Sequence, residues 1–201
     1  MNDCGVLRYN KNMAILDVLI APDPRLKEKS LPIERIDDEV RALAANMLET
    51  MYREQGIGLA AVQVGIHKRL LVADVEWRKE GEPGEQWVII NPEIIEDSDE
   101  MNIYKEGCLS FPDQFGDVKR PKTIRMRYQT LDGMTEEREF DGLLATCIQH
   151  EIDHLNGVTF VDHLSMLKRD MILRKLTKLK KAGAFDHHHH DHVHGPNCNH
   201  G

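Results

Sequence analysis

The sequence predicts an α+β fold: a single compact domain in which short, mostly antiparallel strands surround a central helix, with a further helix at the C-terminal end. Two observations support this prediction. Helical patterns lie towards both ends of the chain, and several short strand-like segments lie between them. In addition, no internal repeat or linker divides the 201 residues, of which 41% are hydrophobic. One globular core therefore accounts for the composition.

Charge and cysteine content exclude several classes of protein. Lys and Arg number 26 against 34 Asp and Glu, a net charge of −8, so direct binding of nucleic acid is not expected. The four cysteines, at positions 4, 108, 147 and 198, show no short paired spacing, which favours a reducing compartment. The apolar run over residues 14–21 is short and contains Asp17, so we expect neither a signal peptide nor a membrane span.

Both ends of the chain are expected to lie outside the folded domain. Residues 1–12 are polar and without pattern, which indicates an N-terminal extension. Seven of the eleven histidines follow Asp186, so residues 185–201 are expected to form a disordered His-rich tail. This tail has two interpretations, a purification or linker remnant and a metal-chelating segment. The folded domain is expected to span residues 13–184.

The first helix is expected over residues 38–54. Asp37 can cap its first turn, and Gly56 is placed to end it. Its apolar positions recur at helical spacing: Val40, Leu43, Ala44, Met47 and Met51.

Four strands are expected in the middle of the chain. They span residues 69–75, 87–90, 123–129 and 136–140, which alternate or run apolar over strand lengths. Asp132-Gly133, between the last two, is a strong hairpin signal.

Two more helices are expected after the strands. Asp141 can cap a helix that runs to Leu155 and closes at Asn156-Gly157. An amphipathic helix follows over residues 164–181, with its apolar positions at Leu167, Met171, Leu176 and Leu179.

The helix that runs to Leu155 contains His150-Glu151-x-x-His154. Residues four apart on a helix lie about 40° apart around its axis and about 6 Å apart along it, so both imidazoles can face one ion. Glu151, about 100° from His150 around the axis, can accept a proton from a water molecule at that metal. The alternative is that two histidines share a helix face by accident and Glu151 is merely solvated.

A catalytic metal site usually has three protein ligands. Cys147 shares a helix face with His150, but it is about 10.5 Å along the axis from His154, too far to bind the same ion. It therefore belongs to the wall of the site or to the core. Cys108, on an extended segment, can approach the helix from the side. From spacing alone, Cys108 is either a ligand or a buried small hydrophobe.

Residues 56–65 form a small, apolar stretch that contains one amide, Gln63. Small residues let a backbone lie close to another chain, and an amide there can donate a hydrogen bond to a developing oxyanion. The alternative is a loop that follows a helix and leads into a buried strand. A phosphate-binding loop is disfavoured because no Gly-Lys-Ser/Thr follows.

Together, three motifs resemble those of the peptide deformylases: GIGLAAVQ at 56–63, EGCLS at 106–110 and QHEIDH at 149–154. Their order and approximate spacings are those of that family. The segment AILDVLIAPDPRL from Ala14 and the segment DGLLATCIQHEIDHLNGVTFVDHLS from Asp141 are also similar to its members. The resemblance covers about residues 13–184. It implies a metal-dependent hydrolase that removes the formyl group from the initiator methionine of new bacterial polypeptides and releases formate.

The resemblance also implies roles for individual residues. His150, His154 and Cys108 would bind the metal, and Glu151 would be the acid and base. Gln63 and the backbone N–H of Leu109 would stabilise the oxyanion. The remaining implied roles concern the substrate: the backbone at Ile57 and Gly58 would pair with the peptide, while Leu143 and Cys147 would line the methionine pocket.

The implied metal is Fe²⁺, one per chain, for which Zn²⁺, Ni²⁺ or Co²⁺ can substitute. The implied partners are N-formyl-Met nascent peptides near the ribosome in the bacterial cytoplasm. One departure from the family pattern is Phe115, where many members have a basic residue. This change affects a polar contact to the distal part of the peptide and leaves the chemistry intact.

Two other functions compete with this interpretation. A zinc endopeptidase would share the His-Glu-x-x-His pattern, although Cys108 would then replace the usual downstream His or Glu ligand. A catalytically silent metal-binding module would explain the His-rich tail. Gln63 and Glu151 speak against that module, because neither is needed merely to hold an ion.

Overall fold

The computed structural model describes residues 14–77 and 84–185, and the predicted N-terminal extension and most of the His-rich tail lie outside these residues. Its three α-helices are α1 (Asp38–Arg53), α2 (Gly142–Leu155) and α3 (Met166–Lys181). Three short 3-10 helices accompany them: η1 (Pro24–Lys27), η2 (Ala61–Val64) and η3 (Phe160–His163). None of the described helices is long and apolar enough to cross a membrane.

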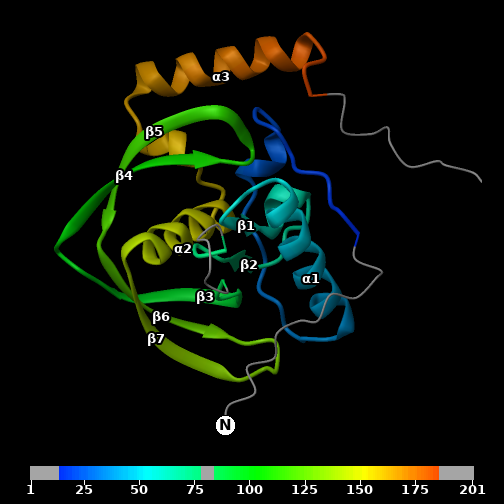
Figure 1. The fold of residues 1–201 in the computed structure, drawn as a ribbon, viewed down its shortest axis with the longest axis vertical. Coiled ribbons are helices and arrows are strands. Elements are labelled where there is room, and N and C mark those ends of the chain that lie inside the picture. Colours follow the sequence, from blue (N-terminus) through cyan, green and yellow to red (C-terminus); the bar gives the residue numbers. More distant parts are fainter. Residues whose placement is uncertain (1–13, 78–83, 186–201) are drawn as a thin grey trace, which may run out of the picture.

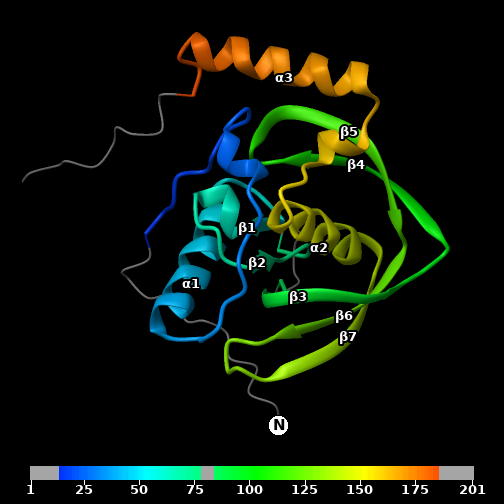
Figure 2. The ribbon, with the colours of Figure 1, turned by 180° about the vertical axis from the view of Figure 1, so that it is seen from behind.

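The strands form two antiparallel sheets. The five-stranded sheet has the order β1-β2-β3-β6-β7, and the two-stranded sheet pairs β4 with β5. The bounds are β1 (Gly58–Ala60), β2 (Leu70–Ala73), β3 (Trp87–Asp97), β4 (Met101–Cys108), β5 (Phe111–Pro121), β6 (Thr123–Gln129) and β7 (Thr135–Asp141). Helix α2 lies between the two sheets, and α3 runs along the outside of the β4–β5 sheet (Figures 1 and 2). This is the predicted α+β domain.

The position of α2 explains its composition. Ten of its 14 residues are buried, because it contacts strands of both sheets. Its apolar side chains, among them Ile148 and Leu155, pack on the inner face of the five-stranded sheet. In a helix enclosed in this way, a buried polar side chain that lacks a partner within the protein is costly and needs an explanation. The polar residues of α2 are therefore the ones most constrained by their surroundings.

The ends of α1 and α2 differ in part from expectation. Asp37 caps α1 as predicted, since its carboxylate accepts a hydrogen bond from the N–H of Val40 (3.1 Å). Gln55, with φ of 57°, takes the left-handed position after α1 that was expected of Gly56. Asp141 occupies the cap position of α2, but its side chain makes no capping hydrogen bond. Gly157 closes α2 with φ of 76°, as its sequence position predicts.

The four predicted strands are all present, and β3 continues seven residues past its expected end at Ile90. Strand β1 and most of the β4–β5 hairpin were not predicted as strands. β1 has only three residues, too few for a periodic signal. β5 contains Pro112, Gly116 and Pro121, residue types that are uncommon within strands. Its buried positions alternate with charged or exposed ones, and few of its side chains are the β-branched or aromatic types typical of strands.

Helix α3 starts at Met166 rather than at the predicted residue 164, because η3 precedes it and Ser165 caps it. The predicted apolar face is also wrong in part. Leu167 and Met171 are 74% and 63% exposed, whereas Ile172 and Leu176 are buried. Helix α3 therefore attaches to the domain by a narrow stripe, which packs with Phe160 and Val161 of η3 and with Phe111 and Val118 of β5.

The burial of Leu176 and the exposure of Leu167 can be compared by the same substitution at both positions of α3. Leu176→Ala should lower the free energy of unfolding by about 2–5 kcal/mol, because it removes a fully buried side chain. Leu167→Ala should change it by less than about 0.5 kcal/mol, because that side chain is exposed. Urea denaturation of both variants measures the difference. Equal losses at the two positions would contradict this packing.

Candidate metal centre and active site

The three sequence-predicted metal ligands meet at one point. His150 and His154 lie one turn apart on α2, with ring centroids 5.0 Å apart, and Cys108 ends β4. One ligand atom from each of the three lies within 4.8 Å of the others, and Cys108 Sγ is 3.2 Å from His154 Nε2. A register shift between Gly107 and Cys108 breaks the regular pairing of β4 with β5 at this cysteine. Bulges of this kind redirect side chains next to functional sites.

The chemistry of these donors fits one divalent transition metal ion. A thiolate and two imidazoles are a common donor set for such ions and leave one position free in a tetrahedral site. Nδ1 of His150 lies 2.8 Å from Glu106 Oε2, so its Nε2 is left to face the cluster. Both histidines are at least nine-tenths buried, which keeps competing water away from them.

Glu106 connects this cluster to a buried ion-pair network. Arg120 donates to both carboxylate oxygens of Glu106 (2.6 and 3.0 Å) and to Asp153 (2.7 Å). Burial raises the pKa of Glu106, but hydrogen bonds from His150 and Arg120 outweigh burial and hold that pKa below its ordinary value. Glu106 is therefore a carboxylate that orients the His150 ring. His163 Nε2 lies 2.7 Å from Asp153 Oδ2, the oxygen that Arg120 also contacts.

Glu151 is enclosed next to the cluster. Burial is the main cause that raises its pKa to about 7. Its Oε2 has no hydrogen-bond partner among the described residues, which is unusual for a carboxylate that is 4% exposed. A Cβ at Gly58 would lie 2.5 Å from Glu151 Oε1. The backbone of β1 therefore passes directly beside this carboxylate, and only glycine permits that approach.

Gln63 reaches the cluster from η2. Its Oε1 accepts a hydrogen bond from the N–H of Ala60 (2.7 Å), which fixes the orientation of the amide. Its Nε2 then faces Ser110 Oγ (3.2 Å) and Cys108 Sγ (3.4 Å). Leu109, the residue after Cys108, stands between two residues that this amide contacts. The structure thus places an amide donor and the backbone of Leu109 on the Cys108 side of the cluster.

Of the four residues expected to contact the substrate, Ile57, Gly58 and Cys147 lie in contact with one another, and Leu143 lies further out at the start of α2. Cys147 Sγ donates to the carbonyl oxygen of Ile57 (3.4 Å), and a Cβ at Gly58 would lie 2.6 Å from the same sulfur. Burial raises the pKa of the Cys147 thiol well above its ordinary value, so it is a neutral group in the wall. Leu143, 42% exposed, lies one turn away at the start of α2.

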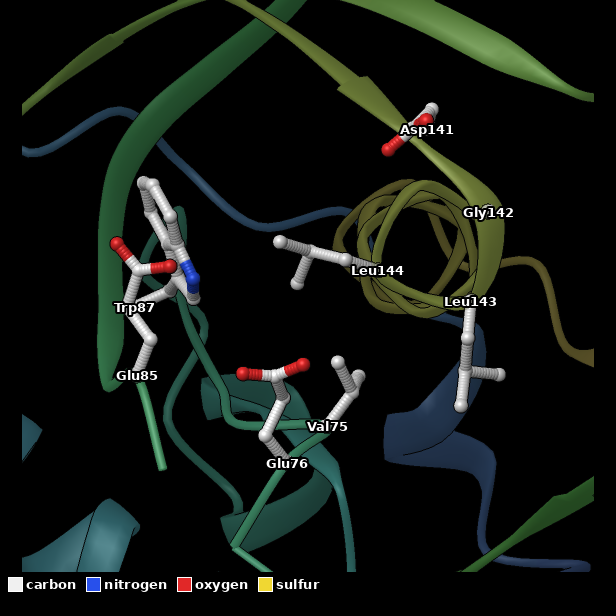
Figure 3. A pocket seen from close by; sticks show the side chains of 8 residues that line it. All are labelled: Val75, Glu76, Glu85, Trp87, Asp141, Gly142, Leu143 and Leu144. Atoms are coloured by element: carbon white, nitrogen blue, oxygen red, sulfur yellow. The ribbon is translucent and has the colours of Figure 1, made fainter. Parts of the chain in front are cut away.

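Leu143 lines a cavity of about 340 Å³ beyond that turn (Figure 3). In Figure 3 the side chain of Leu144 extends from α2 towards Trp87, with the Glu76 carboxylate below it. The lining residues are Val75, Glu76, Glu85, Trp87, Asp141, Gly142, Leu143 and Leu144. Leu143 belongs to this lining, whereas Cys147 contacts Ile57.

Sequence reasoning missed two residues of the site. Glu106 lies in the EGCLS segment two positions before Cys108. Residues two apart on a strand point to the same face, so this spacing could have indicated that Glu106 faces the metal site together with Cys108. Arg120 lies 14 residues away with no local pattern, so only the pairing of β4 with β5 brings it to Glu106. Asp153, within the QHEIDH segment, belongs to the same network because it accepts a hydrogen bond from Arg120.

The site has a sulfur and two imidazoles around one point, with a buried carboxylate and an oriented amide beside them. This arrangement is typical of a metal-dependent hydrolase. The family model described as "Polypeptide deformylase" matches residues 15–170. A peptide deformylase of Rhodopseudomonas palustris is 54% identical over 172 residues, which cover 85% of this chain and 98% of that protein. One of Rhizobium meliloti is 53% identical over 170 residues, covering 85% and 97%.

Solved structures agree with these relatives. The crystal structure of peptide deformylase from Ehrlichia chaffeensis superposes with a TM-score of 0.80 at 41% identity and covers 86% of this chain and 100% of that one. The same enzyme in complex with actinonin gives 0.79 at 44% identity, covering 84% and 99%. The chain therefore belongs to the peptide deformylase family and is a metal-dependent hydrolase. Neither the endopeptidase nor the silent binding module is favoured.

The contact between Glu106 and His150 yields a prediction about metal affinity. Glu106→Gln should weaken metal binding about 10- to 100-fold, because the carboxylate behind the histidine orients its ring and raises its basicity. Competition with a chelator measures the affinity. Glu137→Gln is the matched control, since Glu137 pairs with Arg125 and Arg127 on the outside of the sheet. Unchanged affinity in Glu106→Gln would contradict the assigned orientation.

Proposed function

We propose that this enzyme hydrolyses the formyl amide at the N-terminal methionine of newly made polypeptides and releases formate. One observation carries the proposal: a buried carboxylate, Glu151, lies beside a cluster of one sulfur and two imidazoles. The family supports the substrate. An amide hydrolase needs a group that activates water, a group that moves a proton and donors for the oxyanion. The described residues supply candidates for each.

Cys108, His150 and His154 would hold the metal. When bound, a divalent ion supplies Lewis acidity to water and to the formyl oxygen. We propose Fe²⁺ as that ion, with Zn²⁺, Ni²⁺ or Co²⁺ able to substitute, because mixed sulfur and imidazole donors accept all of them. Glu106 and Arg120 would keep the His150 ring in its ligating orientation from behind.

Glu151 would act as the acid and base. With its pKa near 7, it accepts a proton from the attacking water and then passes that proton to the leaving amine of methionine. The unpartnered Oε2 is the atom available for this transfer. One carboxylate can therefore serve both halves of the reaction.

Gln63 and the N–H of Leu109 would stabilise the tetrahedral oxyanion. The Gln63 amide is oriented in advance by the N–H of Ala60, so its Nε2 needs no reorganisation during the reaction. Each such donor contributes on the order of 3 kcal/mol of barrier lowering.

The peptide would lie along β1. This strand is at the edge of the five-stranded sheet, so the backbone at Ile57 and Gly58 can receive an added antiparallel strand. Cys147 would line the methionine pocket on the α2 side of Gly58, and Leu143 would extend that wall outwards.

The same proposal covers the setting of the enzyme. Formylated chains emerge from ribosomes, so we place the enzyme near them in the bacterial cytoplasm, without direct contact to nucleic acid. The catalytic domain would span residues 13–184. Residues 1–12 and 185–201 would take no part in the chemistry.

The role of Glu151 can be tested directly. Glu151→Ala should retain metal and lose about 10²- to 10⁴-fold in turnover, because it removes the proton-transferring group but no ligand. Formate released from an N-formyl-Met tripeptide measures turnover, and metal analysis measures occupancy. Glu139→Ala, an exposed change on β7, is the control. Unchanged turnover would exclude the mechanism, and wild-type cleavage of unblocked peptides without formate would exclude the function.

A further inference from the structure

The backbone before β1 is fixed from several sides. The N–H of Gly56 donates to the carbonyl of Met51 (2.7 Å), and the carbonyl of Ile57 accepts from the N–H of Asp74 (2.9 Å). The carbonyl of Gly56 accepts from the indole Nε1–H of Trp77 (2.8 Å). Trp77 lies four residues past the end of β2, so this last bond joins a loop to the segment that leads into the edge strand.

The buried carboxylate of Asp74 organises that loop. Asp74 is 1% exposed, and its Oδ1 accepts from the N–H groups of Glu76 (3.1 Å) and Trp77 (3.0 Å). Its Oδ2 accepts from the hydroxyl of Tyr52 on α1 (2.8 Å). The returning chain packs on the same carboxylate, because a Cβ at Gly84 would overlap Oδ2. Asp74 thereby connects the backbone of Trp77 to Tyr52 on α1 and holds it in place.

The Trp77 ring is held as well. It packs edge to face against the Tyr52 ring, with centroids 5.4 Å apart and an interplanar angle of 72°. Tyr52 thus supports Trp77 twice, through the ring and through Asp74. With both the backbone and the ring fixed, the indole N–H can aim at one acceptor, the carbonyl of Gly56. The acceptor that this N–H reaches belongs to the residue directly before Ile57 and Gly58, the backbone proposed to pair with the peptide.

We propose that Trp77 is a positioning residue for the peptide substrate, acting through the carbonyl of Gly56. It sets the position of the Gly56–Gly58 backbone, against which the peptide aligns. The inference rests on the proposed function, in which the edge of β1 receives the peptide. The candidate metal ligands and Glu151 come from β4 and α2 rather than from the segment that Trp77 contacts. Gln63 has its own hydrogen bond from the N–H of Ala60, so kcat is expected to stay unchanged when Trp77 changes.

The proposal predicts a loss that depends on substrate length. Trp77→Phe keeps an aromatic ring against Tyr52 and removes the N–H donor. For an N-formyl-Met tetrapeptide, KM should rise about 3- to 10-fold, the size of one neutral hydrogen bond, with kcat unchanged. For N-formyl-methionine amide, which has no residues beyond methionine to pair with β1, both constants should stay at the wild-type values.

Tyr52→Phe gives a second, independent variant, because it removes the hydroxyl from Asp74 and keeps the ring. It should raise KM for the tetrapeptide in the same direction. Tyr128→Phe is the matched control: it removes one hydroxyl that donates to Glu136 on β7, and both substrates should be unaffected. Thermal denaturation of all variants checks that they are folded.

The outcomes separate this inference from the proposed function. Equal rises in KM for both substrates, or a fall in kcat for both, would show that Trp77 merely stabilises the fold and would overturn the inference. Wild-type constants for Trp77→Phe on the tetrapeptide would overturn it too. Absence of formate from either substrate with the wild-type enzyme would instead reject the proposed function.

Discussion

The contact between His150 Nδ1 and Glu106 Oε2 (2.8 Å) joins the central helix to the two-stranded sheet. The positions of the other candidate metal ligands depend on this contact. Helix α2 is buried on nearly all sides, so its polar side chains must find partners inside the protein. Glu106 gives His150 that partner, and Arg120 in turn neutralises Glu106. Because breaking a buried charged network is costly, this network favours the arrangement of α2 against β4 and β5 that the structure shows.

That arrangement brings Cys108 to the histidines. The same strand that carries Glu106 ends at Cys108, so the carboxylate that orients one imidazole also fixes the distance of the sulfur from the other. From the five-stranded sheet, Gly58 lets β1 approach Glu151 and Cys147 on α2. The two sheets thus contribute different parts of the candidate site: one gives a candidate ligand and its support, and the other gives the backbone that we propose pairs with the peptide.

The sequence was sufficient where the signal is local. The spacing of His150 and His154, the cap at Asp37 and the hairpin at Asp132-Gly133 each depend on a few neighbouring residues, and each appears in the structure as expected. Long-range pairing carries no such signal. Arg120 reaches Glu106 only through the register of β4 with β5, and the burial of α3 on Leu176 rather than Leu167 depends on where η3 ends.

The central claim is that one sulfur and two imidazole nitrogens surround one metal ion. X-ray absorption spectroscopy of the enzyme purified anaerobically, which also identifies the metal, tests that claim directly. The account predicts one sulfur and two imidazole nitrogens in the coordination shell, and loss of the sulfur contribution in Cys108→Ser. A coordination shell without sulfur in the metal-loaded wild-type protein would contradict it.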